Sequence, residues 1–110
     1  MATTYKVLAQ SNPSATTATT LYTVPSATST IISTITICNQ AASAGTYRVA
    51  VRPAGATLAA SHYIAYDIAI AANDTTALTL GITLATTDVV TVYASSASMS
   101  FAAFGSEITA

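Results

Sequence analysis

The sequence contains very little charge. Only 6% of its 110 residues are charged, as three cations and four carboxylates, while 52% are apolar. A freely diffusing domain usually carries about a quarter charged residues, which keep it soluble and keep sheet edges apart. Most of the remaining polar side chains are Thr and Ser hydroxyls. We therefore expect other protein to cover much of this surface.

Three further shortages exclude whole classes of function. Lys6, Arg48 and Arg52 are the only cations, so the chain lacks the basic cluster that binds nucleic acid. Cys38 is the only cysteine, which excludes a disulfide within the chain. No apolar run reaches the roughly 18–20 residues of a membrane-spanning helix, and residues 1–6 show neither the basic nor the apolar part of a signal peptide. We expect synthesis in a cytoplasm and no membrane partner.

The hydrophobic pattern is that of β-strands. Between residues 29 and 39, isoleucine alternates with threonine, a period of two that suits a half-buried pleated surface. The residues concerned are Ile31, Ile35 and Ile37, with Thr30, Thr34 and Thr36 between them. The segment 29–38 is also uncharged and free of proline, so it would add to a foreign strand if it lay on an open edge. It is expected in the middle of a sheet or under a partner.

Other short segments repeat this pattern and are separated by turn-forming residues. They are Tyr5–Gln10, Leu21–Val24, Tyr47–Arg52, His62–Ile70, Leu78–Leu84 across Gly81, Val90–Val92 and Met99–Phe101. Such spacing predicts an all-β fold, a single β-sandwich domain over residues 1–110 that is jelly-roll-like, with about eight short antiparallel strands. Residues 1–20 are expected to form an N-terminal strand followed by an extended segment. That segment is either a plain surface connection or an arm that grips a neighbouring subunit.

No set of residues meets the requirements of catalysis or metal binding. Ser61 and His62 with Asp67 suggest a triad, but adjacent residues of a strand point to opposite faces. His62 is in phase with Ile64 and Tyr66, which favours a partly buried or interface histidine, and Cys38 is expected to be a small buried hydrophobe. The carboxylates are widely spaced and match no calcium loop. We predict no catalytic, cofactor or metal site, and no enzymatic activity.

The few charges and the tyrosines are the best candidates for an interface. Arg48 and Arg52 lie four positions apart on one expected strand and so share a face. They are expected to form ion pairs between subunits with Asp67 or Glu107, or to protect a solvated sheet edge. Six tyrosines and no tryptophan suit interfaces, or sugar binding. The interface candidates are Arg48, Arg52, Tyr22, Tyr47, His62, Tyr63, Tyr66, Asp67 and Glu107.

Several segments, in their order along the chain, carry a resemblance to known proteins. They are Thr20–Pro25, Ile37–Asn39, Tyr47–Gly55, His62–Asp67, Ala72–Thr75, Leu84–Ala94 and Phe104–Ile108. Together they resemble a family of small virion-associated proteins of tailed bacteriophages, including phages of cyanobacteria. The resemblance spans Thr20 to Ile108. It implies a non-enzymatic structural role, on the capsid or on the tail and its fibres, and it brings no catalytic residues.

Composition and resemblance together lead to one expectation and its alternatives. The expectation is a capsid decoration or cement protein of the virion, a symmetric homo-oligomer with a trimer favoured, whose partners are the major capsid protein or tail proteins. The main alternative is a tail-fibre or baseplate accessory domain that contacts host surface glycans. An ice-binding threonine array is a third possibility, but the chain lacks the coil-length repeat that stacks such threonines.

Overall fold

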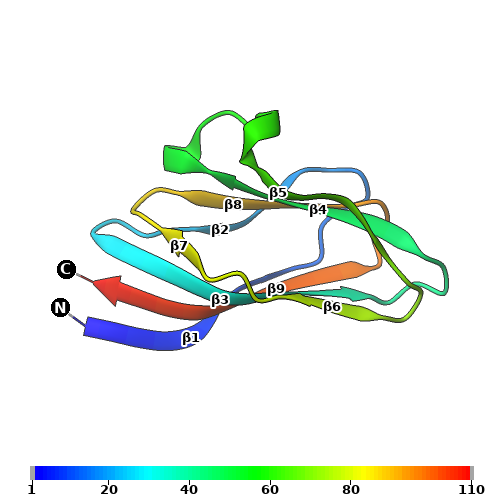
Figure 1. The fold of residues 1–110 in the computed structure, drawn as a ribbon, viewed down its shortest axis with the longest axis horizontal. Helices are drawn as coiled ribbons and strands as arrows, with labels where there is room; N and C mark the ends of the chain where they lie inside the picture. The colour runs from blue at the N-terminus through cyan, green and yellow to red at the C-terminus, as the bar shows by residue number, and fades with distance from the viewer. Residues whose placement is uncertain (1, 110) are drawn as a thin grey trace.

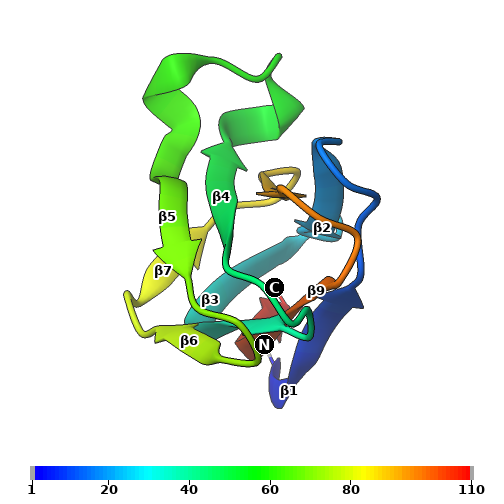
Figure 2. The ribbon, with the colours of Figure 1, turned by 90° about the vertical axis from the view of Figure 1, so that its right-hand side faces the viewer.

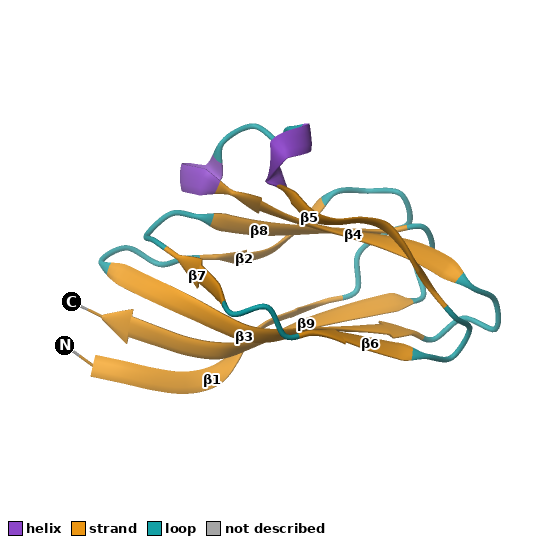
Figure 3. Cartoon of the chain, in the orientation of Figure 1, coloured by secondary structure: helices purple, strands orange, loops and turns teal. Residues whose placement is uncertain are grey.

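The computed structural model describes residues 2–109, which form nine β-strands in two antiparallel sheets packed face to face (Figure 1). This confirms the expected all-β sandwich. The strands are β1 (Ala2–Ser11), β2 (Thr19–Thr23), β3 (Thr28–Asn39), β4 (Gly45–Arg52), β5 (Tyr63–Ile70), β6 (Thr75–Leu78), β7 (Ile82–Leu84), β8 (Val89–Ala94) and β9 (Met99–Thr109). Two single 3-10 turns, η1 (Pro53–Gly55) and η2 (Ala60–His62), lie between β4 and β5 (Figure 3).

The strands are divided between a first and a second sheet. The first sheet has the order β1-β9-β3-β6, and β7 pairs with β3 on the same side as β6; the second has the order β2-β8-β4-β5. Viewed from one end, β4 and β5 stand apart from the layer that contains β1, β3 and β6 (Figure 2). Ala2 pairs with Thr109, so the ends of β1 and β9 lie side by side.

The strand expected across Gly81 is interrupted. Residues 79–81 leave the sheet, Leu80 is exposed, and Gly81 has a left-handed φ of 65°. β6 and β7 then pair with different parts of β3, at residues 35–38 and 30–32. The glycine supplies the conformation that an L side chain rarely adopts, so the break coincides with the residue that permits it.

The alternation predicted that the isoleucines of β3 lie on one face, but in the structure they lie on two. A register shift between Ile32 and Thr34 places Ser33 in a β-bulge, which changes the side to which the following residues point. Ile32, Ile35 and Ile37 are therefore buried, whereas Ile31 is 39% exposed on the outer face. The bulge also turns Thr30 inward, where it is buried.

The row expected from His62 to Ile70 is wrong for a similar reason. His62 lies in η2, before the strand begins. Within β5, register shifts opposite residues 47–50 of β4 disturb the alternation, and Ile64 and Tyr66 are exposed. Ile68 pairs with Tyr47, but it is also exposed because β5 is the edge strand of its sheet. Ala65 and Ile70 are the β5 residues that reach the core.

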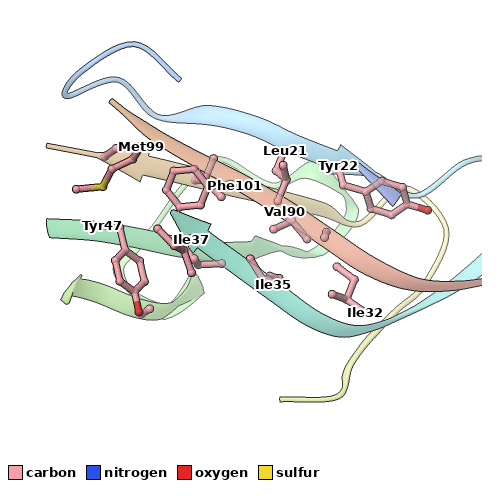
Figure 4. Packing of buried hydrophobic residues seen from close by; sticks show 14 of the residues in the cluster. Leu21, Tyr22, Ile32, Ile35, Ile37, Tyr47, Val90, Met99 and Phe101 are labelled. Atoms are coloured by element: carbon pink, nitrogen blue, oxygen red, sulfur yellow. The ribbon is translucent and has the colours of Figure 1, made fainter. Parts of the chain in front are cut away.

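Side chains from the inner faces of both sheets form one hydrophobic core (Figure 4). Tyr47 and Val49 of β4 point inward. The Tyr47 ring meets Phe101 of β9 edge to face, with 6.5 Å between ring centroids. Tyr47, named above as an interface candidate, is therefore a core residue and does not reach the surface. Cys38 is only partly buried, which corrects the expectation that it is a buried residue.

The Tyr47 hydroxyl is buried and finds no hydrogen-bond partner among residues 2–109. Burial raises the pKa of this phenol above its ordinary value of 10.0. A buried polar group without a partner reduces stability, because it loses its bonds to water on folding. Tyr47→Phe is expected to raise the free energy of unfolding by about 1 kcal/mol, measured by urea denaturation. A lower stability of this variant would show that the hydroxyl has a partner.

Candidate interaction site on the second sheet

The outer face of the second sheet carries a cluster of one arginine, one carboxylate and three tyrosines, here called the tyrosine-arginine cluster. Its members are Arg48, Tyr63, Tyr66, Asp67 and Tyr93. Arg48 points outward because Tyr47 and Val49, its neighbours in β4, fill the core. Its guanidinium carbon lies 4.2 Å from the ring centroid of Tyr66 and 4.2 Å from that of Tyr93, so the cation is held between two aromatic rings.

Asp67 completes the contacts of Arg48. Arg48 Nε donates to Asp67 Oδ1 at 2.7 Å and Nη2 donates to Oδ2 at 3.3 Å, a two-point contact between planar groups. Hydrogen bonding to Asp67 raises the pKa of Arg48 further above its ordinary range, so it stays charged at all accessible pH values. Three side chains, those of Tyr66, Tyr93 and Asp67, thus fix the position of this guanidinium without a partner subunit.

A β-bulge in β5 explains how two consecutive residues both reach Arg48. Tyr47 pairs with Ile68 and Val49 with Ala65, so Tyr66 and Asp67 together lie opposite the single residue Arg48. Asp67 has a left-handed φ of 50°, which is unusual for a residue with a side chain. Alternation in a regular strand would have sent Tyr66 and Asp67 to opposite faces. The bulge is therefore what assembles the cluster.

An apolar depression lies beside the cluster, with a volume of about 600 Å³. It is lined by Leu58, Ala59 and Ala60 of the β4–β5 connection and by the rings of Tyr63 and Tyr66. These rings meet edge to face at 4.9 Å, and Tyr66 is 55% exposed. His62 shapes the same connection, because its Nδ1 accepts a hydrogen bond from the Ala59 N–H at 3.1 Å. The surface offers aromatic rings to a flat ligand.

The structure brings only some of the interface candidates together. Arg48, Tyr63, Tyr66 and Asp67 share the cluster, and His62 adjoins it. Tyr93, also in the cluster, is signalled in the sequence by its alternation with Val90 and Val92, which points it outward. Arg52 lies on the same outer face, but it donates to Thr91 Oγ1 at 3.1 Å and to the carbonyls of Gly55 and Ala56, which tie η1 to the sheet.

Tyr22 and Glu107 meet elsewhere, between the sheets, in a network with Lys6 and Thr30. The Tyr22 hydroxyl donates to Glu107 Oε2 at 2.5 Å and lies 2.8 Å from Thr30 Oγ1. Lys6 Nζ lies 2.9 Å from Glu107 Oε1. Asp67 and Glu107, expected to pair with a neighbouring subunit, thus have cationic partners in their own chain. No sequence signal links Lys6 to Glu107, since the pairing of β1 with β9 joins the two ends of the chain.

The Tyr22 hydroxyl makes stability dependent on pH in alkali. Burial first, and the Glu107 carboxylate second, raise the pKa of Tyr22 from 10.0 to about 12. Above pH 10 the folded protein thus keeps a proton that the unfolded chain loses. The contribution of Tyr22 to the free energy of unfolding is therefore complete below pH 10 and is lost as the pH rises toward about 12. Tyr22→Phe is expected to lower the free energy of unfolding by about 1–2 kcal/mol at neutral pH, measured by urea denaturation.

The matched comparison repeats the measurement on Tyr22→Phe at a pH of about 11. There the difference in free energy of unfolding between the variant and the original protein should be smaller. Tyr47, whose pKa is also raised, is present in both proteins and cancels. A difference that does not change with pH would contradict the network.

The Glu107 carboxylate makes stability dependent on pH in acid. Hydrogen bonds from Tyr22 and Lys6 lower the pKa of Glu107 below 4.5, so the contribution of this carboxylate to the free energy of unfolding is lost as the pH falls below that value.

Within residues 2–109, no three His, Cys, Asp or Glu side chains lie close enough to hold a metal ion. The same residues contain no helix long and apolar enough to cross a membrane. Comparison of the chain with protein-family models, with characterised proteins and with solved structures found no match.

Proposed function

We propose that this protein is a non-enzymatic structural component of a tailed-phage virion, and specifically a capsid decoration or cement protein that stabilises capsomer contacts. The observation that carries the proposal is the outer face of the first sheet, on which the described strands place no charged side chain. Lys6 and Glu107, the charges of β1 and β9, meet between the sheets instead. A face without charges can be covered by another protein without leaving a buried charge unpaired.

The outer face of the first sheet mixes apolar and hydroxyl side chains in rows across its strands. One row runs Tyr5–Ser106–Ile31–Thr83, and the next runs Val7–Phe104–Thr34. Tyr5 is 83% and Val7 50% exposed. We refer to these residues as the outer patch. Exposed apolar patches rimmed by polar groups mark interaction surfaces, which supports an assembling protein over a free one.

The strand order also supports the proposal. If β6 and β7 count as one interrupted strand, each sheet has four positions, and the chain changes sheet at every connection except that between β4 and β5, as in a jelly roll. We infer that the sandwich is a jelly roll, an architecture that viral capsid proteins and lectins share. Shared architecture alone does not establish function, so the outer patch supports the proposal more strongly than the fold does.

Immunogold electron microscopy of purified particles of the phage that encodes the chain would test the proposal. Label over the head is expected for a decoration protein. Label on the tail alone would favour the tail-fibre or baseplate role. Particles without label, alongside a labelled major capsid protein as positive control, would overturn the virion assignment.

The tail role, with binding of host surface glycans, has one specific observation in its favour. The depression beside Tyr63 and Tyr66 offers aromatic rings, on which the apolar faces of sugars stack, next to the polar groups of Arg48 and Asp67. A glycan array should then show binding that Tyr66→Ala abolishes and Tyr5→Ala, which removes an exposed tyrosine from the other sheet, leaves intact. An array without binding would remove this role.

A further inference from the structure

Each sheet of the sandwich has two edges, and these four edges differ in how well they resist pairing with a strand of another chain. In the described chain, β2 has five residues, β6 and β7 have four and three, and β5 is disturbed by bulges. Shortness and bulges are the usual means by which proteins protect sheet edges. β1 has ten residues, and its first six, Ala2–Val7, are all exposed and precede its single register shift. β1 is therefore the unprotected edge.

Lys6 does not protect this edge either. A lysine on an edge strand blocks pairing when a partner strand would bury its charge without compensation. Here Glu107 of the neighbouring strand β9 lies 2.9 Å from Lys6 Nζ and neutralises it. Proline is absent from β1, so its backbone can donate hydrogen bonds along the free side.

We propose that two copies of this chain pair antiparallel through residues 3–7 of β1, so that the first sheet runs continuously through both copies. The occupant is a second copy because a twofold axis sets an identical strand antiparallel to itself, with each free backbone donor facing an acceptor. This inference rests on the proposed structural role, and it names a surface for the homo-oligomer expected from the sequence. It also replaces the expected trimer by a dimer.

Side chains select the register of this pairing. An axis at Lys6 would set Tyr5 opposite Val7 and so would not pair the two Tyr5 rings. An axis at Tyr5 places the two Tyr5 rings opposite each other, Thr4 opposite Lys6, and Thr3 opposite Val7. Tyr5 is the most exposed large apolar side chain of the described residues, and an aromatic cross-strand pair stabilises antiparallel sheets. The pairing joins the outer patches of both copies into one uncharged face.

Sedimentation equilibrium at micromolar concentrations would test the pairing. The original protein is expected to have twice the mass of the chain. Tyr5→Lys sets like charges opposite each other and is expected to have the mass of one chain, while its circular dichroism stays unchanged because Tyr5 is exposed. Leu80→Lys, which changes an exposed apolar residue of the β6–β7 connection, is the matched control and should stay dimeric.

Disulfide formation would test the register. In a Cys38→Ser background, Tyr5→Cys places two cysteines at the axis, at the Cα separation that a disulfide requires, so oxidation should link most of the protein into dimers. Thr3→Cys, on the same face but off the axis, should link far more slowly. Faster linkage at residue 3 would overturn the register.

The outcomes separate this inference from the proposed function. If the original protein is a dimer and Tyr5→Lys is also a dimer, β1 is not the contact, but self-assembly stands. If the original protein is a monomer throughout, the β1 pairing and the self-assembly both fail. Immunogold labelling then decides the virion role independently.

Discussion

Replacing Ile35 with lysine is expected to abolish soluble expression of this protein. Ile35 lies in the middle of β3, paired with Ala103 of β9 on one side and Leu78 of β6 on the other, and it is 0% exposed. A lysine there would leave an ammonium group in the core, and an unpaired buried charge costs several kcal/mol. Since whole domains are stable by only about 5–15 kcal/mol, this loss is expected to prevent folding. The soluble fraction after expression is the measurement.

Ile31→Lys is the matched control for this substitution, because it makes the same change in the same strand. Ile31 is on the other side of the Ser33 bulge, on the outer face, so its lysine would remain in water. This variant should express in soluble form with an unchanged circular dichroism spectrum. Equal solubility of both variants would mean that residue 35 does not face the core.

The second large effect is expected at Gly105 of β9. A Cβ at this position would overlap the carbonyl oxygen of Ile31 and lie 3.0 Å from the Cα of Ile32, both backbone atoms that no side-chain rotation can move. Gly105 pairs with Ile32 beside the Ser33 bulge and with Lys6 close to the register shift of β1. Gly105→Ala is therefore expected to lower the free energy of unfolding by about 3 kcal/mol or more, measured by urea denaturation.

Gly81→Ala distinguishes this steric effect from the ordinary cost of replacing a glycine. Gly81 has a left-handed φ, and a Cβ there would meet no atom within 4 Å. Its substitution is expected to cost about 1–2 kcal/mol, from backbone conformation alone. If Gly105→Ala cost no more than Gly81→Ala, β9 and β3 would not approach as closely as the structure shows.

The positions of most strands could be predicted from local pattern. In residues 47–52 the alternation separates Val49, which is buried, from Arg48, which lies at the surface, since successive side chains of a strand point to opposite faces. The same rule failed in β3 and β5. A β-bulge adds one residue to a strand, so the side chains that follow it point to the opposite faces from those predicted. Neither Ser33 nor Asp67 is a residue type that predicts a bulge from the sequence.

The candidate sites were harder to predict than the strands. The sequence identified Arg48 and Tyr66 as interface candidates but not the contact between them, because the bulge at Asp67 brings them together. It named Glu107 but not Lys6, since only the pairing of β1 with β9 makes them neighbours. The interface candidates named from the sequence also included Tyr47, because a tyrosine hydroxyl suits an interface, but its ring is buried against Phe101.

By itself, the sequence determined that this is a charge-poor, hydroxyl-rich all-β chain without a disulfide, because composition and period-two alternation act locally on every strand. Tertiary structure decided which face of the sandwich is uncharged, which edge is open and which side chains meet at Arg48. These features depend on sheet order, register and bulges, which bring distant residues together through backbone hydrogen bonds that every residue type can form.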